Sequence, residues 1–66
     1  MLLKSSRIKL AEYNDSTEIL TIEFVAGGRY KYFSVPENIY HGLISSKSPG
    51  AYFDSVIKTR YNFKKS

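Results

Sequence analysis

Two alternating segments joined by a pair of glycines constrain the fold more than any other feature of the sequence. Residues 19–25 carry large apolar side chains at the even positions 20, 22 and 24, with Thr, Glu and Val between and after them. This period of two is the period of a β-strand. Gly27 and Gly28 supply the positive φ angles that a tight hairpin needs. Residues 29–33 are therefore expected to return as a second, antiparallel strand.

Two loop lengths are compatible with this hairpin. A two-residue loop of Gly27 and Gly28 pairs Phe24 with Lys31, which places a lysine on the apolar face. A three-residue loop over residues 26–28 instead sets up the pairs Val25–Arg29, Phe24–Tyr30, Glu23–Lys31 and Ile22–Tyr32. It gathers on one face Leu20, Ile22, Phe24, Tyr30 and Tyr32. We favour the three-residue loop, because it also brings opposite charges together on the other face.

The remaining segments supply one more strand and two helices. Residues 7–13 predict a first strand whose apolar phase slips by one residue at Ala11, which a β-bulge or an early strand end would explain. A capping box of Ser34 and Glu37 around Pro36 predicts the start of a first helix. Ser48-Pro49 repeats that signal for a second helix. Residues 61–63 are expected to dock as a short extension, and residues 64–66 to form a frayed tail.

Together these segments predict one α+β domain over residues 1–66, with a three-stranded antiparallel sheet followed by two short helices packed on one face. The helices are needed because a lone sheet cannot bury its apolar side. A chain of 66 residues hides only about 60% of its unfolded surface, so we expect marginal stability. The absence of cysteine suits a reducing, cytoplasmic location. No apolar run approaches the ~18 residues of a membrane helix, so no membrane partner is expected.

The distribution of charge is more informative than the net charge of +4. Residues 1–10 contain three basic side chains and no acid, and residues 57–66 contain four basic side chains and no acid. Residues 11–56 carry a net charge of −3. If the two ends meet in the fold, they form one positive face suited to phosphate groups. The alternative is that these lysines and arginines simply keep a small protein soluble.

Residues that could carry chemistry are few. His41 is the only histidine, no cysteine is present, and no carboxylates stand at ligand spacing, so no metal site is expected. No glycine-rich phosphate loop appears, so no nucleotide cofactor is expected. A serine nucleophile needs a base and an orienting group, and one helical histidine is thin evidence for that arrangement. We therefore expect no catalytic residues and no enzyme activity.

The centre and the C-terminal half of the chain carry an ordered series of motifs. They are Ile22-Glu23-Phe24, Gly27-Gly28-Arg29-Tyr30-Lys31-Tyr32, Val35-Pro36, Ser48-Pro49-Gly50-Ala51-Tyr52-Phe53, Ile57-Lys58 and Arg60-Tyr61-Asn62-Phe63. This series resembles the KTSC domain, a module named after the C-terminus of some lysyl-tRNA synthetases, from Ser5 to Phe63. Pro49 departs from the pattern, since a basic residue is common there. The resemblance implies a stand-alone, single-domain member of a kind found in bacteria and their phages, with RNA binding as a suggested function.

We accordingly expect a small binding module, with RNA as the first class of partner. The candidate nucleic-acid-binding residues are Arg7, Lys9, Arg29, Lys31, Phe33, Lys58, Arg60, Lys64 and Lys65. Tyr30 and Tyr32 of the family motif could stack on bases, but the favoured register makes them core residues instead. The alternative is a protein–protein interaction or self-association module, a bacterial or phage accessory protein whose sheet is completed by a partner or by a second copy of itself.

Overall fold

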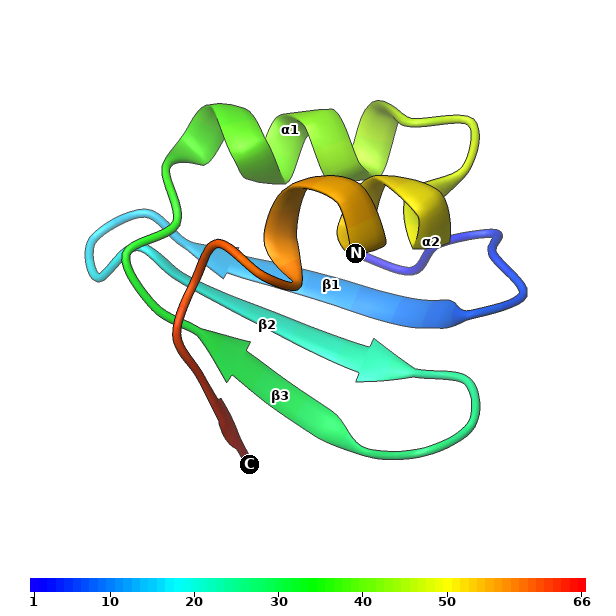
Figure 1. Ribbon diagram of the computed structural model, residues 1–66, viewed down its shortest axis with the longest axis horizontal. Coiled ribbons are helices and arrows are strands. Elements are labelled where there is room, and N and C mark those ends of the chain that lie inside the picture. Colours follow the sequence, from blue (N-terminus) through cyan, green and yellow to red (C-terminus); the bar gives the residue numbers. More distant parts are fainter.

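The computed structural model describes all 66 residues, and its strands and helices form two layers (Figure 1). In chain order the elements are β1 (Ile8–Asn14), β2 (Ile19–Phe24), β3 (Arg29–Tyr32), α1 (Glu37–Ser45), α2 (Pro49–Tyr52), the π-helical turn η1 (Phe53–Ile57) and β4 (Phe63–Lys65). The strands form one antiparallel sheet in the order β1-β2-β3-β4. The helical segments cover one face of this sheet, which confirms the predicted α+β class. None of the helices has the length and apolar character needed to cross a bilayer.

The β2–β3 hairpin has the predicted faces but a different register. Ile22 pairs with Tyr30 and Leu20 pairs with Tyr32, two residues away from the predicted pairing. The loop closes earlier than expected because the Phe24 N–H donates to the Gly28 carbonyl at 3.1 Å. Gly27 and Gly28 then lie at φ 110° and 94°, where a side chain would be strained. A shift of two residues keeps every side chain on its face, because the side-chain period of a strand is also two.

The charged pair that we predicted across this hairpin is wrong. Glu23 faces Arg29 in the observed register, and Lys31 faces Thr21. The physical reason is the loop closure at Phe24, which moves the returning strand by two residues relative to β2. An opposite charge still lies across from Glu23, now at the loop end of the sheet.

The phase slip in the first strand is a β-bulge, which is one of the two explanations that the sequence analysis offered. Ile8 pairs with Phe24 while Leu10 pairs with Glu23, so one extra residue, Lys9, lies between two consecutive partners. Ile8 and Ala11 both face the core and are fully buried. The strand begins and ends one residue later than predicted.

The sheet has a fourth strand that the sequence analysis missed. Tyr32 pairs with Phe63 and Tyr30 pairs with Lys65, and the Ser66 N–H donates to the Arg29 carbonyl at 2.8 Å. The prediction of a frayed tail over residues 64–66 is therefore wrong. The outer edge of β3 offers backbone donors and acceptors, and the C-terminal segment satisfies them.

The first helix does not use the predicted capping box. Pro36 precedes Glu37 at the helix start, and no side chain caps the free N–H groups. Ser34 lies instead at φ 57°, where it turns the chain out of the sheet. The N–H of the next residue, buried Val35, donates to the Glu18 carbonyl at 2.9 Å. This anchoring of the crossover, rather than a side-chain cap, determines where α1 begins.

The second helical segment begins at Pro49 as predicted, but it changes character after four residues. The Lys58 N–H donates to the Phe53 carbonyl, five residues earlier, at 2.9 Å. That spacing defines a π-helical turn, which is rare and widens the helix locally.

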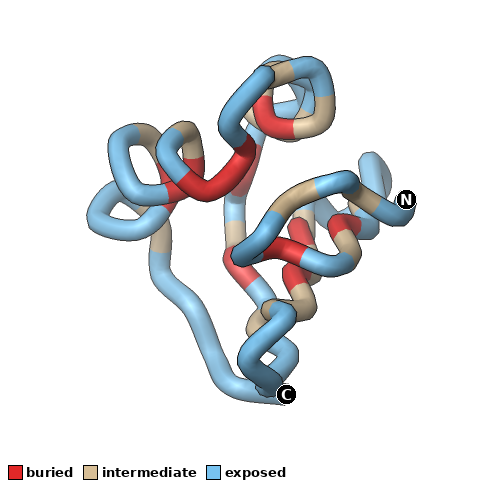
Figure 2. Tube along the Cα trace, turned by 90° about the vertical axis from the view of Figure 1, so that its right-hand side faces the viewer, coloured by how far each residue is buried: buried red, intermediate tan, exposed pale blue.

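The core lies between the two layers, where the buried residues of helices and strands face one another (Figure 2). Its members are Ile8, Ala11, Leu20, Ile22, Tyr32, Val35, Leu43, Phe53 and Ile57. The Tyr13 hydroxyl ties β1 to the segment before α1 by donating to the Val35 carbonyl at 2.7 Å, and its ring stacks on Tyr40 of α1 at 5.1 Å between ring centroids.

The two basic ends of the chain lie at opposite edges of the sheet. The N-terminal residues extend the β1 edge, where Leu2 bridges to Leu10 and the Ala11 N–H donates to the Met1 carbonyl. The C-terminal residues extend the β3 edge as β4. The terminal strands therefore lie apart, but Arg7 of the N-terminal basic segment and Lys58 of the C-terminal basic segment line one common groove.

Candidate nucleic-acid interface

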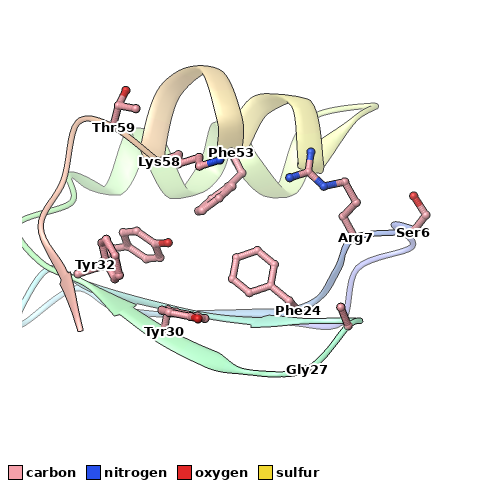
Figure 3. A pocket seen from close by; sticks show the side chains of 11 residues that line it. Ser6, Arg7, Phe24, Gly27, Tyr30, Tyr32, Phe53, Lys58 and Thr59 are labelled. Atoms are coloured by element: carbon pink, nitrogen blue, oxygen red, sulfur yellow. The ribbon is translucent and has the colours of Figure 1, made fainter. Parts of the chain in front are cut away.

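A groove of about 590 Å³ opens between η1 and the β2–β4 side of the sheet (Figure 3). It is lined by Ser6, Arg7, Phe24, Ala26, Gly27, Tyr30, Tyr32, Phe53, Lys58, Thr59 and Phe63. Five of these eleven residues are aromatic, two are basic and none is acidic. A concave, mainly apolar surface with a few polar groups is the usual form of a ligand site.

The sheet side of the groove is built from rings on three neighbouring strands. Tyr30 on β3 makes edge-to-face contacts with Phe24 on β2 and with Phe63 on β4, each at 5.7 Å between ring centroids. Phe63 is 56% exposed and Tyr30 is half-buried, whereas Tyr32 is only 4% exposed. Burial raises the pKa of the Tyr32 phenol above its ordinary value of 10.0. Tyr30 and Phe63 thus offer accessible ring surface.

The helix side of the groove is shaped by η1. Phe53 lies 5.3 Å from the Phe24 ring and 5.5 Å from the Tyr32 ring, both edge-to-face. The π-helical hydrogen bond from Lys58 to Phe53 brings these two residues to the same side of the turn, and both line the groove. Figure 3 shows Lys58 and Phe53 on the helix side, across from Tyr30 and Tyr32.

An ion pair lies at one end of the groove. Arg7 donates to both carboxylate oxygens of Asp54, at 2.6 Å and 2.9 Å, and to the Gly50 carbonyl at 3.2 Å. The hydrogen bond from Arg7 and its positive charge hold the pKa of Asp54 below its ordinary value. The charge of Arg7 is therefore largely balanced, and its main contact joins the start of β1 to η1.

A second carboxylate balances two more of the candidate cations. Glu23 accepts a hydrogen bond from Arg29 at 2.7 Å and lies 3.6 Å from the Lys9 ammonium. The bond from Arg29 lowers the pKa of Glu23, with smaller contributions from the two positive charges. These three residues lie on or beside the sheet face that the helices leave open.

The other basic candidates are Lys31, Lys58, Arg60, Lys64 and Lys65, and none of them forms a salt bridge. Lys65 lies directly opposite Tyr30, so its side chain is on the groove face of the sheet. Lys64 lies opposite Lys31 on the open face. The structure therefore places Lys58 and Lys65 on the groove side and Lys31 and Lys64 on the open face, whereas Arg60 lies in the turn after η1 and does not line the groove.

Phe33 does not belong to the groove. It follows β3, is half-buried, and donates its N–H to the Asn62 carbonyl at 2.9 Å. The sequence analysis instead missed Phe24, Phe53 and Phe63 as site residues. The available signal for Phe63 was its place in the closing aromatic motif, but without β4 nothing connected that motif to Tyr30. No group of three or more histidine and carboxylate side chains is close enough together to hold a metal ion.

Comparison with known proteins places this geometry in a family. The sequence model of the KTSC domain matches residues 4–61, which is most of the chain. The chain belongs to the KTSC domain family. A crystal structure of a KTSC domain protein from Yersinia pestis superimposes with a TM-score of 0.97 at 35% identity, covering 100% of this chain and 93% of that one.

Related sequences occur both as short proteins and inside a larger enzyme. An uncharacterized protein of Stutzerimonas stutzeri is 32% identical over 59 residues, which are 89% of this chain and 83% of that protein. A lysine–tRNA ligase of Nostoc punctiforme is 38% identical over 61 residues, which are 92% of this chain. The chain spans only about a tenth of the ligase, 11% of its length.

In this KTSC domain the side chains of the Tyr30-Lys31-Tyr32 motif lie on both faces of the sheet. Tyr32 is part of the buried core, Tyr30 is on the groove, and Lys31 points to the opposite face. The glycine of the later motif also has a packing reason, because a β-carbon on Gly50 would lie 2.9 Å from Cδ of Arg7. In this chain Tyr30 and Tyr32 thus line the groove, and Gly50 leaves room for Arg7 at its end.

Proposed function

We propose that this KTSC domain is a non-catalytic module that binds single-stranded RNA, with a base in the aromatic groove and phosphates at the basic residues beside it. One observation carries the proposal: the accessible rings of Tyr30 and Phe63 line a groove that has no acidic side chain in its lining, and the carboxylate at its end, that of Asp54, is paired with Arg7. Lys58 borders the same groove, and Lys65 lies next to Tyr30 on the same face.

The physical basis is stacking combined with phosphate attraction. Stacking of a base on an aromatic side chain contributes about 1–3 kcal/mol and works for every base, because each base has a π-face. Lysines without a carboxylate partner can neutralise phosphates, which gives affinity with little sequence choice and a strong salt dependence. A duplex stacks its bases internally, so a groove of this kind favours an unpaired strand.

The relatives support this direction. Lysine–tRNA ligases carry a segment similar to this chain, and their name states that tRNA is one of their substrates. A module that binds unpaired RNA would suit such an enzyme as an additional RNA-binding domain. RNA lies in the cytoplasm, so the proposal assigns the protein to that compartment.

The test is binding to labelled single-stranded RNA, tRNA and duplex RNA between about 50 and 200 mM salt. We expect micromolar binding to the single strand that weakens steeply with salt. Lys65→Gln should reduce the salt slope by about 1. Lys64→Gln is the matched control, since it removes the same charge from the neighbouring residue of β4 on the opposite face, and it should leave the slope unchanged. Absence of binding at low salt would remove the proposal.

One observation favours a second function, a protein interaction. β4 is a three-residue edge strand, and all three of its residues are exposed. Such an edge can pair with a strand of another protein or of a second copy of this chain. Sedimentation at increasing concentration tests the self-associating form. A dimer lost in Lys65→Pro, which removes an N–H directed away from β3, would favour it, and a monomer would speak against it.

A further inference from the structure

A second depression adjoins the aromatic groove. It has a volume of about 370 Å³ and lies between the segment before β1 and the start of α2. It is lined by Lys4, Ser5, Ser6, Arg7, Lys47, Ser48, Pro49, Gly50 and Ala51. Ser6 and Arg7 also line the aromatic groove, so the two hollows meet across these residues.

The composition of this depression differs sharply from that of the groove. Its lining contains three basic side chains, three serines and no carboxylate. Arg7 is held by Asp54 and Gly50, but Lys4 and Lys47 form no salt bridge. These two lysines come from segments far apart in the sequence, and only the fold brings them to one hollow. Their charges are therefore available to an external anion.

The hydroxyl of Ser5 is oriented by the backbone. Its Oγ accepts hydrogen bonds from the N–H of Arg7 at 3.1 Å and of Ile8 at 3.2 Å. Both bonds use the oxygen as acceptor, which leaves the hydroxyl proton free to be donated to a ligand. A donor hydroxyl beside two ammonium groups is an arrangement that suits phosphate oxygens.

We propose that this depression binds the terminal phosphate of the RNA strand whose base lies in the aromatic groove. This inference rests on the proposed function and specifies its ligand: a single strand that ends in a phosphate monoester, at its 5′ or its 3′ end. A phosphate monoester carries about −1.5 to −2 charges near pH 7, whereas an internal phosphodiester carries one. Two unpaired lysines therefore discriminate in favour of a phosphorylated end.

The test uses the intact protein and three unlabelled uridine tetranucleotides that compete with a labelled single strand. One has a 5′-phosphate, one has a 3′-phosphate and one has hydroxyls at both ends. We expect one of the phosphorylated strands to bind about fivefold more tightly than the unphosphorylated strand, a gain typical of two exposed charge pairs. The end that gives the gain identifies the polarity of the bound strand.

The double variant Lys4→Gln/Lys47→Gln should remove this preference and leave the affinity for the unphosphorylated strand within about twofold. The matched control Lys31→Gln/Lys64→Gln removes two charges from the open face and should retain the preference. All four lysines are exposed, and thermal melting checks that each variant folds. Equal binding of the three strands to the wild type would overturn the terminal-phosphate inference but leave RNA binding in place. Failure of every strand to bind would overturn both.

Discussion

The phenol of Tyr52 lies where a β-carbon on Gly42 would be. A β-carbon built there falls 2.6 Å from Cζ of the tyrosine, and the Tyr52 hydroxyl donates to the Ile39 carbonyl at 3.2 Å. From sequence alone, Gly42 is a weak point in the interior of α1. In the structure, the absence of a side chain on Gly42 leaves the space that the Tyr52 ring of α2 occupies.

Gly42→Ala should therefore destabilise the protein, although alanine is the better helix former by about 1 kcal/mol. The clash with Tyr52 should outweigh that gain and produce a net loss of about 1–3 kcal/mol in the free energy of unfolding. Urea denaturation measures the loss. The same substitution in a Tyr52→Ala background removes the clash, so alanine should there be neutral or stabilising. A loss of equal size in both backgrounds would contradict this account.

Truncation of Tyr32 should unfold or strongly destabilise the domain. Its ring is 4% exposed and contacts Phe53 and Phe63, so Tyr32→Ala should cost about 3–5 kcal/mol. Tyr30→Ala is the comparison within the same motif. Since Tyr30 is half-buried, its truncation should cost about 2 kcal/mol or less. Thermal melting followed by circular dichroism distinguishes the two, and a Tyr32→Ala protein that melts like the wild type would exclude its role in the core.

The Arg7–Asp54 pair should make stability depend on pH in the acid range. The pKa of Asp54 is lowered in the folded state, chiefly by the hydrogen bond from Arg7. Its stabilising effect is therefore fully present above the ordinary value of 3.8 and is lost as pH falls through the lower, folded-state pKa.

Asp54→Asn removes this contribution, so the difference in urea midpoint between wild type and variant should be largest at neutral pH and should disappear under strong acid. Asp15→Asn is the control, since that carboxylate lies in an exposed turn and forms no salt bridge. A difference in urea midpoint that grows as pH falls would contradict a stabilising Arg7–Asp54 pair.

Phe63→Ala should separate binding from stability. The side chain is 56% exposed, so its removal should cost little folding free energy. If a base stacks on Phe63, the affinity for single-stranded RNA should fall about tenfold or more. Fluorescence anisotropy gives the affinity and a parallel urea titration gives the stability. Unchanged affinity would locate base stacking away from the β4 side of the groove.

The faces of the central hairpin followed from the sequence even though its register did not. Leu20, Ile22 and Tyr32 share a face in the predicted pairing and in the observed one, which differs by two residues. The alternation of side chains decides the face, and any even shift preserves it. The bulge at Lys9 was likewise visible as a phase slip, because one extra residue in a strand reverses the alternation after it.

The groove depended on contacts that no local pattern records. Phe63 reaches Tyr30 only because β4 pairs with β3, and three residues that include two lysines show no alternation long enough to predict a strand. The helix side of the groove depends on a π-helical turn, which begins at Phe53 without a distinct sequence signal. Alternation and turn chemistry thus determined the layers and their faces. Long-range backbone pairing decided which aromatic and basic side chains meet. Residues distant in sequence become neighbours only when another segment pairs with the free backbone groups of an edge strand or packs against the apolar face of a helix.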